Sequence, residues 1–99
     1  MITAVTEFKL KEGVDVKPIL LNLEGYAVTY VGFLRAEYFV DVTDRSHVSV
    51  ISTWERLEDW AEWELSRIRE QILHEAETSF LEKPSTAVYK PLTIVDWID

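Results

Sequence analysis

The chain has 99 residues, 47% of them hydrophobic and 28% charged, which is the composition of one globular domain. Its 10 basic and 18 acidic residues give a net charge of −8, and Lys and Arg form no cluster, so we expect no nucleic-acid partner. The absence of cysteine excludes disulfides, thiolate nucleophiles and thiolate metal sites. No apolar run approaches the ~20 residues that span a bilayer, and no signal-peptide pattern is present, so we expect a cytoplasmic protein without a membrane partner.

The first half of the chain predicts a strand, a helix and a second strand. Residues 2–10 alternate between two faces, one of them mainly apolar, which is the period of a strand with one buried face. Asp15 can cap a helix and Pro18 suits a first helical turn, and apolar residues then recur at helical spacing as far as residues 25–27. From residue 31 to residue 42 the period returns to two, which predicts the second strand.

The second half predicts a hairpin, a long helix and a fourth strand. Residues 43–46 are polar and are typical of a hairpin loop, and residues 47–54 alternate as a third strand. Residues 57–81 carry apolar side chains three or four apart, which predicts an amphipathic helix with one candidate break near Ser66. A fourth strand follows and is interrupted at Pro91, a residue that strands tolerate mainly at an edge or a bulge.

This order of elements, βαββαβ, is that of ferredoxin-like α+β domains. Such a domain has a four-stranded antiparallel sheet with the helices on one face only. We expect residues 1–99 to form a single domain, in which residues 91–99 are an apolar C-terminal extension.

The arrangement leaves one face of the sheet without helices. The alternation of the strands places four apolar side chains on this face: Val5, Phe33, Phe39 and Ile51. A monomer would expose them to water, so we expect a two-fold homodimer whose sheets pack face to face. The C-terminal extension is then expected to contact the partner subunit.

Several residues at fixed positions resemble a known family. They are Gly13 after the first strand, the Gly32-Phe33 pair before the second, and Trp54 followed by Leu57, Trp60 and Trp63. With this order of elements, residues 1–90 resemble the antibiotic biosynthesis monooxygenase (ABM) domain of the dimeric α+β barrel superfamily. The resemblance implies a dimeric barrel. It also implies one of several activities, because similar proteins include cofactor-free oxygenases of quinols and aromatic polyketides, heme-degrading monooxygenases and small proteins of no assigned activity.

The heme-degrading branch implies a specific set of residues. It is similar to this chain at Trp63, but it also uses an Asn on the first strand, a position that falls on Thr6, and an iron-ligating His. That His position falls on Leu73, one residue before His74. One residue turns a helical side chain by about 100°. His74 would therefore need a local insertion or bulge to reach the place of the iron-ligating His. With that condition, heme held by His74 is the alternative to a cofactor-free site.

The two histidines give no other sign of chemistry. His47 and His74 lack the H-x-x-x-H and H-x-H spacings of metal sites, so we expect no bound metal. On a continuous helix His74 points about 200° away from Ile72 and faces solvent. His47 begins a strand beside a turn, where no Asp or Ser partner is evident in the sequence, and we interpret it as a surface residue rather than a general base.

The tryptophans and a few small or polar side chains indicate a pocket between the sheet and the helices. Trp60 lies near the apolar helical stripe that contains Leu65 and is interpreted as core, whereas Trp63 faces inward only if the helix breaks near Ser66. Hydroxyl residues interrupt the helix-facing strand positions, and aromatic faces can stack on a flat ring. The predicted pocket comprises Thr6, Ala36, Tyr38, Ser52, Trp54 and Trp63.

These observations favour a cofactor-independent monooxygenase of a small aromatic substrate, a quinol or a phenol. Hydroxyls would hold the phenolic oxygen, indoles would stack on the ring, and the deprotonated substrate would react directly with dioxygen. None of the six residues is a strong base at neutral pH, so no catalytic residue is assigned. The same lack favours a non-catalytic binding or assembly module as the alternative, with heme degradation as the third.

Overall fold

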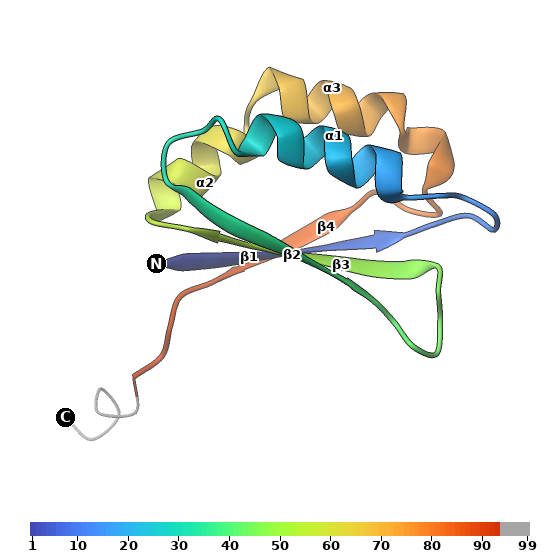
Figure 1. Ribbon diagram of the computed structural model, residues 1–99, viewed down its shortest axis with the longest axis horizontal. Coiled ribbons are helices and arrows are strands. Elements are labelled where there is room, and N and C mark those ends of the chain that lie inside the picture. The colour runs from blue at the N-terminus through green and yellow to red at the C-terminus, as the bar shows by residue number, and fades with distance from the viewer. Residues whose placement is uncertain (94–99) are drawn as a thin grey trace.

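The computed structural model describes residues 1–93, which form one antiparallel sheet with all helices on one face (Figure 1). The strands lie in the order β2-β3-β1-β4. Their bounds are β1 (Ile2–Lys9), β2 (Phe33–Val40), β3 (His47–Trp54) and β4 (Ser85–Tyr89). The helices are α1 (Lys17–Ala27), α2 (Leu57–Glu64) and α3 (Arg67–Glu75), followed by a 3-10 turn, η1 (Glu77–Ser79). The expected ferredoxin-like α+β fold is confirmed.

The register of the sheet brings small and polar side chains together beneath the helices. On the central strand β1, Ala4 lies opposite Ser52 of β3, and Thr6 lies opposite Thr86 of β4. Because these positions share one parity, their side chains all point toward the helices. The side chains in this part of the sheet are small. The size of the space between the sheet and the helices therefore depends on the side chains of the helices.

One strand departs from the simple alternation. The pairing of β2 with β3 shifts between Phe33 and Arg35, so that Phe33 lies opposite Trp54 and Arg35 lies opposite Thr53. The extra residue, Leu34, reverses the facing of the strand at that point and is 44% exposed. The Phe33 ring packs edge-on against Trp54 with centroids 5.3 Å apart. The prediction that Phe33 lies on the uncovered face is therefore wrong.

The second helical segment is shorter and more broken than the prediction of residues 57–81. It divides into α2 and α3 at Ser66, the predicted break, and α3 ends at Glu75. The Ser66 hydroxyl caps α3 by accepting from the backbone N–H of Arg69 at 3.2 Å, and it donates to the Trp63 carbonyl at 2.7 Å. The break turns Trp63 into the core and leaves Leu65, predicted on the apolar stripe, 80% exposed.

Two clusters of buried side chains lie between the sheet and the helices. One contains Ala4, Ala27, Trp54, Trp60 and Trp63. The other contains Phe8, Leu10, Leu20, Val48 and Phe80. Within the first, the Trp54 and Trp60 rings meet edge to face with centroids 5.9 Å apart, so the interpretation of Trp60 as core is confirmed.

The face of the sheet opposite the helices stays uncovered in a single chain. Phe39 is 50% exposed there, and Arg35 pairs within its own strand with Glu37, at 3.5 Å between Nε and Oε1. Residues 90–93 lead away from the sheet (Figure 1), and the rest of the predicted extension, residues 94–99, lies outside the described residues. The homodimer thus stays a prediction. None of the helices within residues 1–93 is long and apolar enough to cross a bilayer.

Candidate functional site

The six residues of the predicted pocket all line one cavity between the sheet and the helices. Thr6, Ala36, Tyr38, Ser52, Trp54 and Trp63 are joined there by residues of α1, α2 and α3. The cavity holds about 50 Å³, room for a few water molecules and much less than the several hundred Å³ typical of sites for small organic ligands. An aromatic guest therefore requires side chains at its edge to move. The role of the six residues in binding stays a prediction.

The two buried hydroxyls of the pocket already have protein partners. The hydroxyls of Thr6 and Thr86 lie 2.8 Å apart, and Ser52 Oγ accepts from Trp54 Nε1 at 3.0 Å. A hydroxyl has one hydrogen to donate and two lone pairs. Ser52 therefore keeps its own hydrogen for a guest molecule or a water.

The indoles form the end wall of the cavity. Trp54 is completely buried and Trp63 nearly so, and the ring of Trp63 meets the Tyr30 ring edge to face with centroids 5.1 Å apart. This contact fixes the plane of the Trp63 indole. The end wall is thus buried and closely packed, unlike the partly exposed edge at Tyr38.

Glu24 of α1 is a cavity residue that the sequence analysis did not identify. It lies four residues after Leu20 and three before Ala27, so it occupies a position of the buried helical face where an apolar side chain is expected. That misplaced charge was the signal available in the sequence. A carboxylate at a mainly apolar wall supplies the proton acceptor that the six predicted residues lack.

Tyr38 lies beside Glu24 and differs from it in proton chemistry. Burial raises the pKa of the Tyr38 phenol because it disfavours the charged phenolate. Glu24 raises it further, by accepting a hydrogen bond from the phenol and by its own negative charge. The phenol therefore stays protonated at neutral pH and acts as a hydrogen-bond donor. Together the two residues can accept a proton and donate a hydrogen bond within one cavity.

Arg69 of α3 is the second charged cavity residue that was missed. It precedes the buried Ile72 by three residues and so lies on the inward face of its helix. Its guanidinium carbon lies 5.5 Å from the centroid of the Trp60 ring, a cation–π contact. Burial lowers the pKa of the guanidinium from its usual value, but an arginine keeps its charge at any physiological pH.

A buried carboxylate, that of Asp59, packs against Gly32, the residue that precedes β2. Asp59 of α2 is 5% exposed and pairs with Arg56, with Oδ1 and Nη2 3.3 Å apart. Gly32 has φ +85°, and a Cβ there would lie 2.1 Å from Asp59 Oδ2. Only glycine fits this close approach. The Gly32-Phe33 pair noted in the sequence thus has a structural cause. Gly32 has no Cβ and so leaves room for the Asp59 carboxylate, and Phe33 packs on Trp54.

The residues present do not fit a heme iron site. His74 is exposed on the outer side of α3 beside Glu77, with Nδ1 and Oε2 3.4 Å apart, and it does not line the cavity. Leu73, at the position expected for the ligating His, packs against the cluster around Phe8. Thr6, at the position of the Asn, is bonded to Thr86. The cavity therefore presents no nitrogen ligand for iron from these positions.

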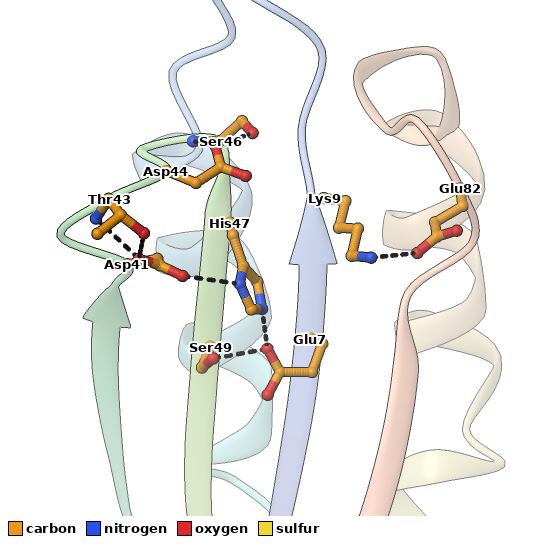
Figure 2. Close-up of polar contacts among 9 residues, drawn as sticks. All are labelled: Glu7, Lys9, Asp41, Thr43, Asp44, Ser46, His47, Ser49 and Glu82. Carbon is orange, nitrogen blue, oxygen red and sulfur yellow. Dashed lines mark hydrogen bonds and ion pairs between the residues drawn. The ribbon is translucent and has the colours of Figure 1, made fainter.

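His47 has partners that the sequence analysis did not find (Figure 2). Its Nε2 lies 2.5 Å from Glu7 Oε2, and its Nδ1 lies 3.4 Å from Asp41 Oδ2. Ser49 Oγ donates to the same Glu7 oxygen at 2.6 Å, so the hydroxyl contacts the carboxylate and not the imidazole. Both carboxylates raise the pKa of His47, with Glu7 contributing most. This network lies on the uncovered face of the sheet, away from the cavity, and makes no Ser-His nucleophile.

Metal binding has no support within residues 1–93, where no group of three or more His, Asp or Glu side chains is placed to hold an ion. The chemistry available at the cavity is proton transfer, hydrogen bonding and aromatic contact.

Neither a protein-family model nor a curated protein matches the chain, but solved structures share its fold. A structure described as an antibiotic biosynthesis monooxygenase has a TM-score of 0.80 and 14% identity, over 94% of this chain and 100% of its own. SnoaB from Streptomyces nogalater, described as a cofactor-independent oxygenase, has a TM-score of 0.80 and 10% identity over 93% of each chain. A conserved protein from Methanosarcina mazei Go1 has a TM-score of 0.73 and 12% identity over 92% of each. The chain therefore has the ferredoxin-like α+β fold of the antibiotic biosynthesis monooxygenases.

Proposed function

We propose that the chain is a cofactor-independent monooxygenase that acts on a small phenol or quinol in the cavity between sheet and helices. The observation that carries the proposal is the presence of Glu24 beside Tyr38 in a cavity walled by Trp54 and Trp63. The description of SnoaB as a cofactor-independent oxygenase supports it, since that protein has the same fold.

In the proposed reaction Glu24 accepts the proton that activates the substrate. Tyr38, which keeps its proton, donates a hydrogen bond to a substrate oxygen, and Ser52 has a hydrogen free for a second one. The resulting phenolate has carbanion character at the ring C–H carbon ortho or para to its oxygen, and this carbon bonds to dioxygen and gives a hydroperoxide after protonation. Loss of water then leaves a carbonyl. One oxygen atom stays in the product, the other leaves as water, and the substrate supplies all the electrons.

The substrate must enlarge the cavity to enter. Tyr38 and Leu20 separate the cavity from an open groove of about 650 Å³ beside the loop between β1 and α1. Tyr38 is only partly buried. Rotamer changes of surface side chains on binding are common and cost little, so this edge can open without a change of the fold.

Oxygen consumption with a panel of hydroquinones and anthrones tests the proposal. We expect uptake with the wild type, and a loss of at least about a hundredfold in Glu24→Gln, because general-base catalysis contributes about 10²–10⁴-fold. Glu62→Gln is the matched control, since Glu62 is exposed on α2 and does not line the cavity. Equal rates in Glu24→Gln and the wild type would refute the role of Glu24, and no uptake with any substrate would refute the activity.

A non-catalytic binding module of the same fold is the second candidate. It is favoured by the small volume of the cavity and by the protein partners of Thr6 and Ser52. This candidate predicts that aromatic ligands shift the melting temperature in wild type and in Glu24→Gln alike, with no oxygen consumed.

A further inference from the structure

Arg69 is the one arginine within residues 1–93 that is partly buried and forms no ion pair; Arg45 and Arg67 also form none, but both are exposed. The carboxylate of Glu64 acts on the Arg69 charge without pairing with it. Arg56 pairs with Asp59 and Arg35 with Glu37. Within residues 1–93 the Arg69 side chain makes no ion pair and no hydrogen bond, although it is partly buried, and its one specific contact is the Trp60 ring. A guanidinium withdrawn from water normally meets a carboxylate or phosphate, because its donors lose their hydration otherwise.

The position of this guanidinium is also unusual. Arg69 lines the internal cavity of about 50 Å³ and also an open groove of about 620 Å³ that runs over α3 toward β4. Among the residues lining these two spaces it is the single one they share. The Arg69 side chain is thus the partition between them, and moving it would join the cavity to the groove.

From these two observations we infer that Arg69 is the specificity-determining residue of the site and binds an anionic oxygen, a carboxylate or a phenolate, carried by the aromatic ligand. The inference rests on the proposed function only in taking the cavity as the ligand site. A ligand of this kind enters along the groove over α3, a second route beside the edge at Tyr38. Its anionic oxygen takes two N–H donors of the guanidinium, and its ring lies toward Trp60 and Trp63.

Replacing the contact of Arg69 with Trp60 by an ion pair with the ligand is energetically favourable. The cation–π contact with Trp60 that now holds Arg69 is weak, whereas a bidentate pair of a guanidinium with an oxyanion is stronger and directional. The free energy lost when Arg69 leaves Trp60 is therefore smaller than the free energy gained from the ion pair with the ligand. In addition, the movement that binds the anion is the same movement that opens the cavity, which would admit anionic rings in preference to neutral ones of equal size.

A matched pair of probes tests the inference without any chemistry. The probes are 2-naphthoate and the neutral 2-naphthalenemethanol, with binding measured by calorimetry and by quenching of tryptophan fluorescence. We expect 2-naphthoate to bind the wild type at least about tenfold more tightly. The preference should disappear in Arg69→Gln, with the affinity for the neutral probe unchanged, and should persist in part in Arg69→Lys, which keeps the charge but not the planar pair of donors.

Arg67→Gln is the control, because Arg67 is exposed on the same helix and lines neither space. It should keep the full preference. Circular dichroism establishes that each variant is folded, and Arg69→Lys serves as the test if Arg69→Gln is not. Equal affinity of the wild type for both probes, absence of binding by both, or an unchanged preference in Arg69→Gln would overturn the inference.

The outcome is separable from that of the proposed function. Anion-selective binding through Arg69 without oxygen consumption would leave the inference standing and refute the oxygenase. Oxygen consumption by a wild type that binds 2-naphthoate and 2-naphthalenemethanol with equal affinity would do the reverse.

Discussion

The imidazole of His47 and the carboxylate of Glu7 meet across neighbouring strands, with Nε2 and Oε2 2.5 Å apart (Figure 2). Glu7 on β1 lies opposite Ser49 on β3, so His47, two residues earlier on the same face, reaches it diagonally. Asp41, at the end of β2, approaches the other ring nitrogen. The network therefore ties three strands of the sheet together through one titratable side chain.

The pH dependence of stability follows from the pKa shifts of this network. The carboxylates raise the pKa of His47. The contribution of protonated His47 to the free energy of unfolding is therefore complete below its ordinary pKa of about 6.5, and it is lost as the pH rises through the raised value. The pKa of Glu7 is lowered, chiefly by the Ser49 hydroxyl, and that of Asp41 by Thr43. Their contributions are complete above about pH 4.5 and are lost as the pH falls through the lowered values.

We therefore expect His47→Gln to lower the melting temperature most between about pH 4.5 and 6.5, and progressively less as the pH rises through the raised pKa of His47. Thermal unfolding followed by circular dichroism across this range measures the difference. His74→Gln is the matched control and should give a small difference, because that side chain is 74% exposed. A His47→Gln effect that grows toward alkaline pH would contradict the assignment of the charges.

The parts of the fold that follow from periodicity were predictable. The sheet, its order of elements and the inward side of each strand depend on alternation that is visible in the sequence. The facing of Phe33 was not, because a single-residue bulge leaves no mark in a pattern of period two. The end of α3 at Glu75 was also missed, since the apolar spacing continues to Phe80 while the backbone turns through η1 to place that residue opposite Leu10.

Part of the candidate site was likewise predictable from the sequence, and part was not. Small and hydroxyl residues on helix-facing strand positions predicted a cavity, and all six line one. Glu24 and Arg69 were not predicted as cavity residues, although both occupy inward positions of their helices. The partners of His47 depend on a diagonal contact between strands, which requires the register and not the sequence alone.

The three glycines provide a graded test of backbone and packing constraints. Gly32→Ala should destabilise the protein by about 2–3 kcal/mol, because the residue has φ +85° and its new Cβ would collide with Asp59. Gly13 has φ +79° but open space around it, so Gly13→Ala should destabilise the protein only by the backbone strain, about 1 kcal/mol. Gly25→Ala lies in α1 with open space and should stabilise by about 0.5–1 kcal/mol. Urea unfolding measures all three, and a neutral Gly32→Ala would contradict the packing of Asp59.

The cap at Ser66 gives a prediction about the division between α2 and α3. Ser66→Ala removes the acceptor of the Arg69 N–H and should cost about 1 kcal/mol in the free energy of unfolding. Because this hydroxyl also holds the Trp63 carbonyl, the fluorescence emission of the tryptophans should shift to longer wavelength as Trp63 gains contact with water. Ser85→Ala, at the exposed start of β4, is the control and should change neither quantity. A variant as stable as the wild type would mean that the break does not depend on the cap.

The uncovered face of the sheet predicts the state of association. Phe39 is half exposed there, and we expect two copies to bury this face against each other, so the wild type should sediment as a dimer at micromolar concentration. Phe39→Glu places a charge in the contact and should yield a folded monomer, since an unpaired charge is costly to bury. Leu65→Glu is the matched control: Leu65 is 80% exposed on the helical side and its replacement should leave the dimer intact. Analytical ultracentrifugation distinguishes the cases, and a monomeric wild type would show that this face is open to water or to another partner.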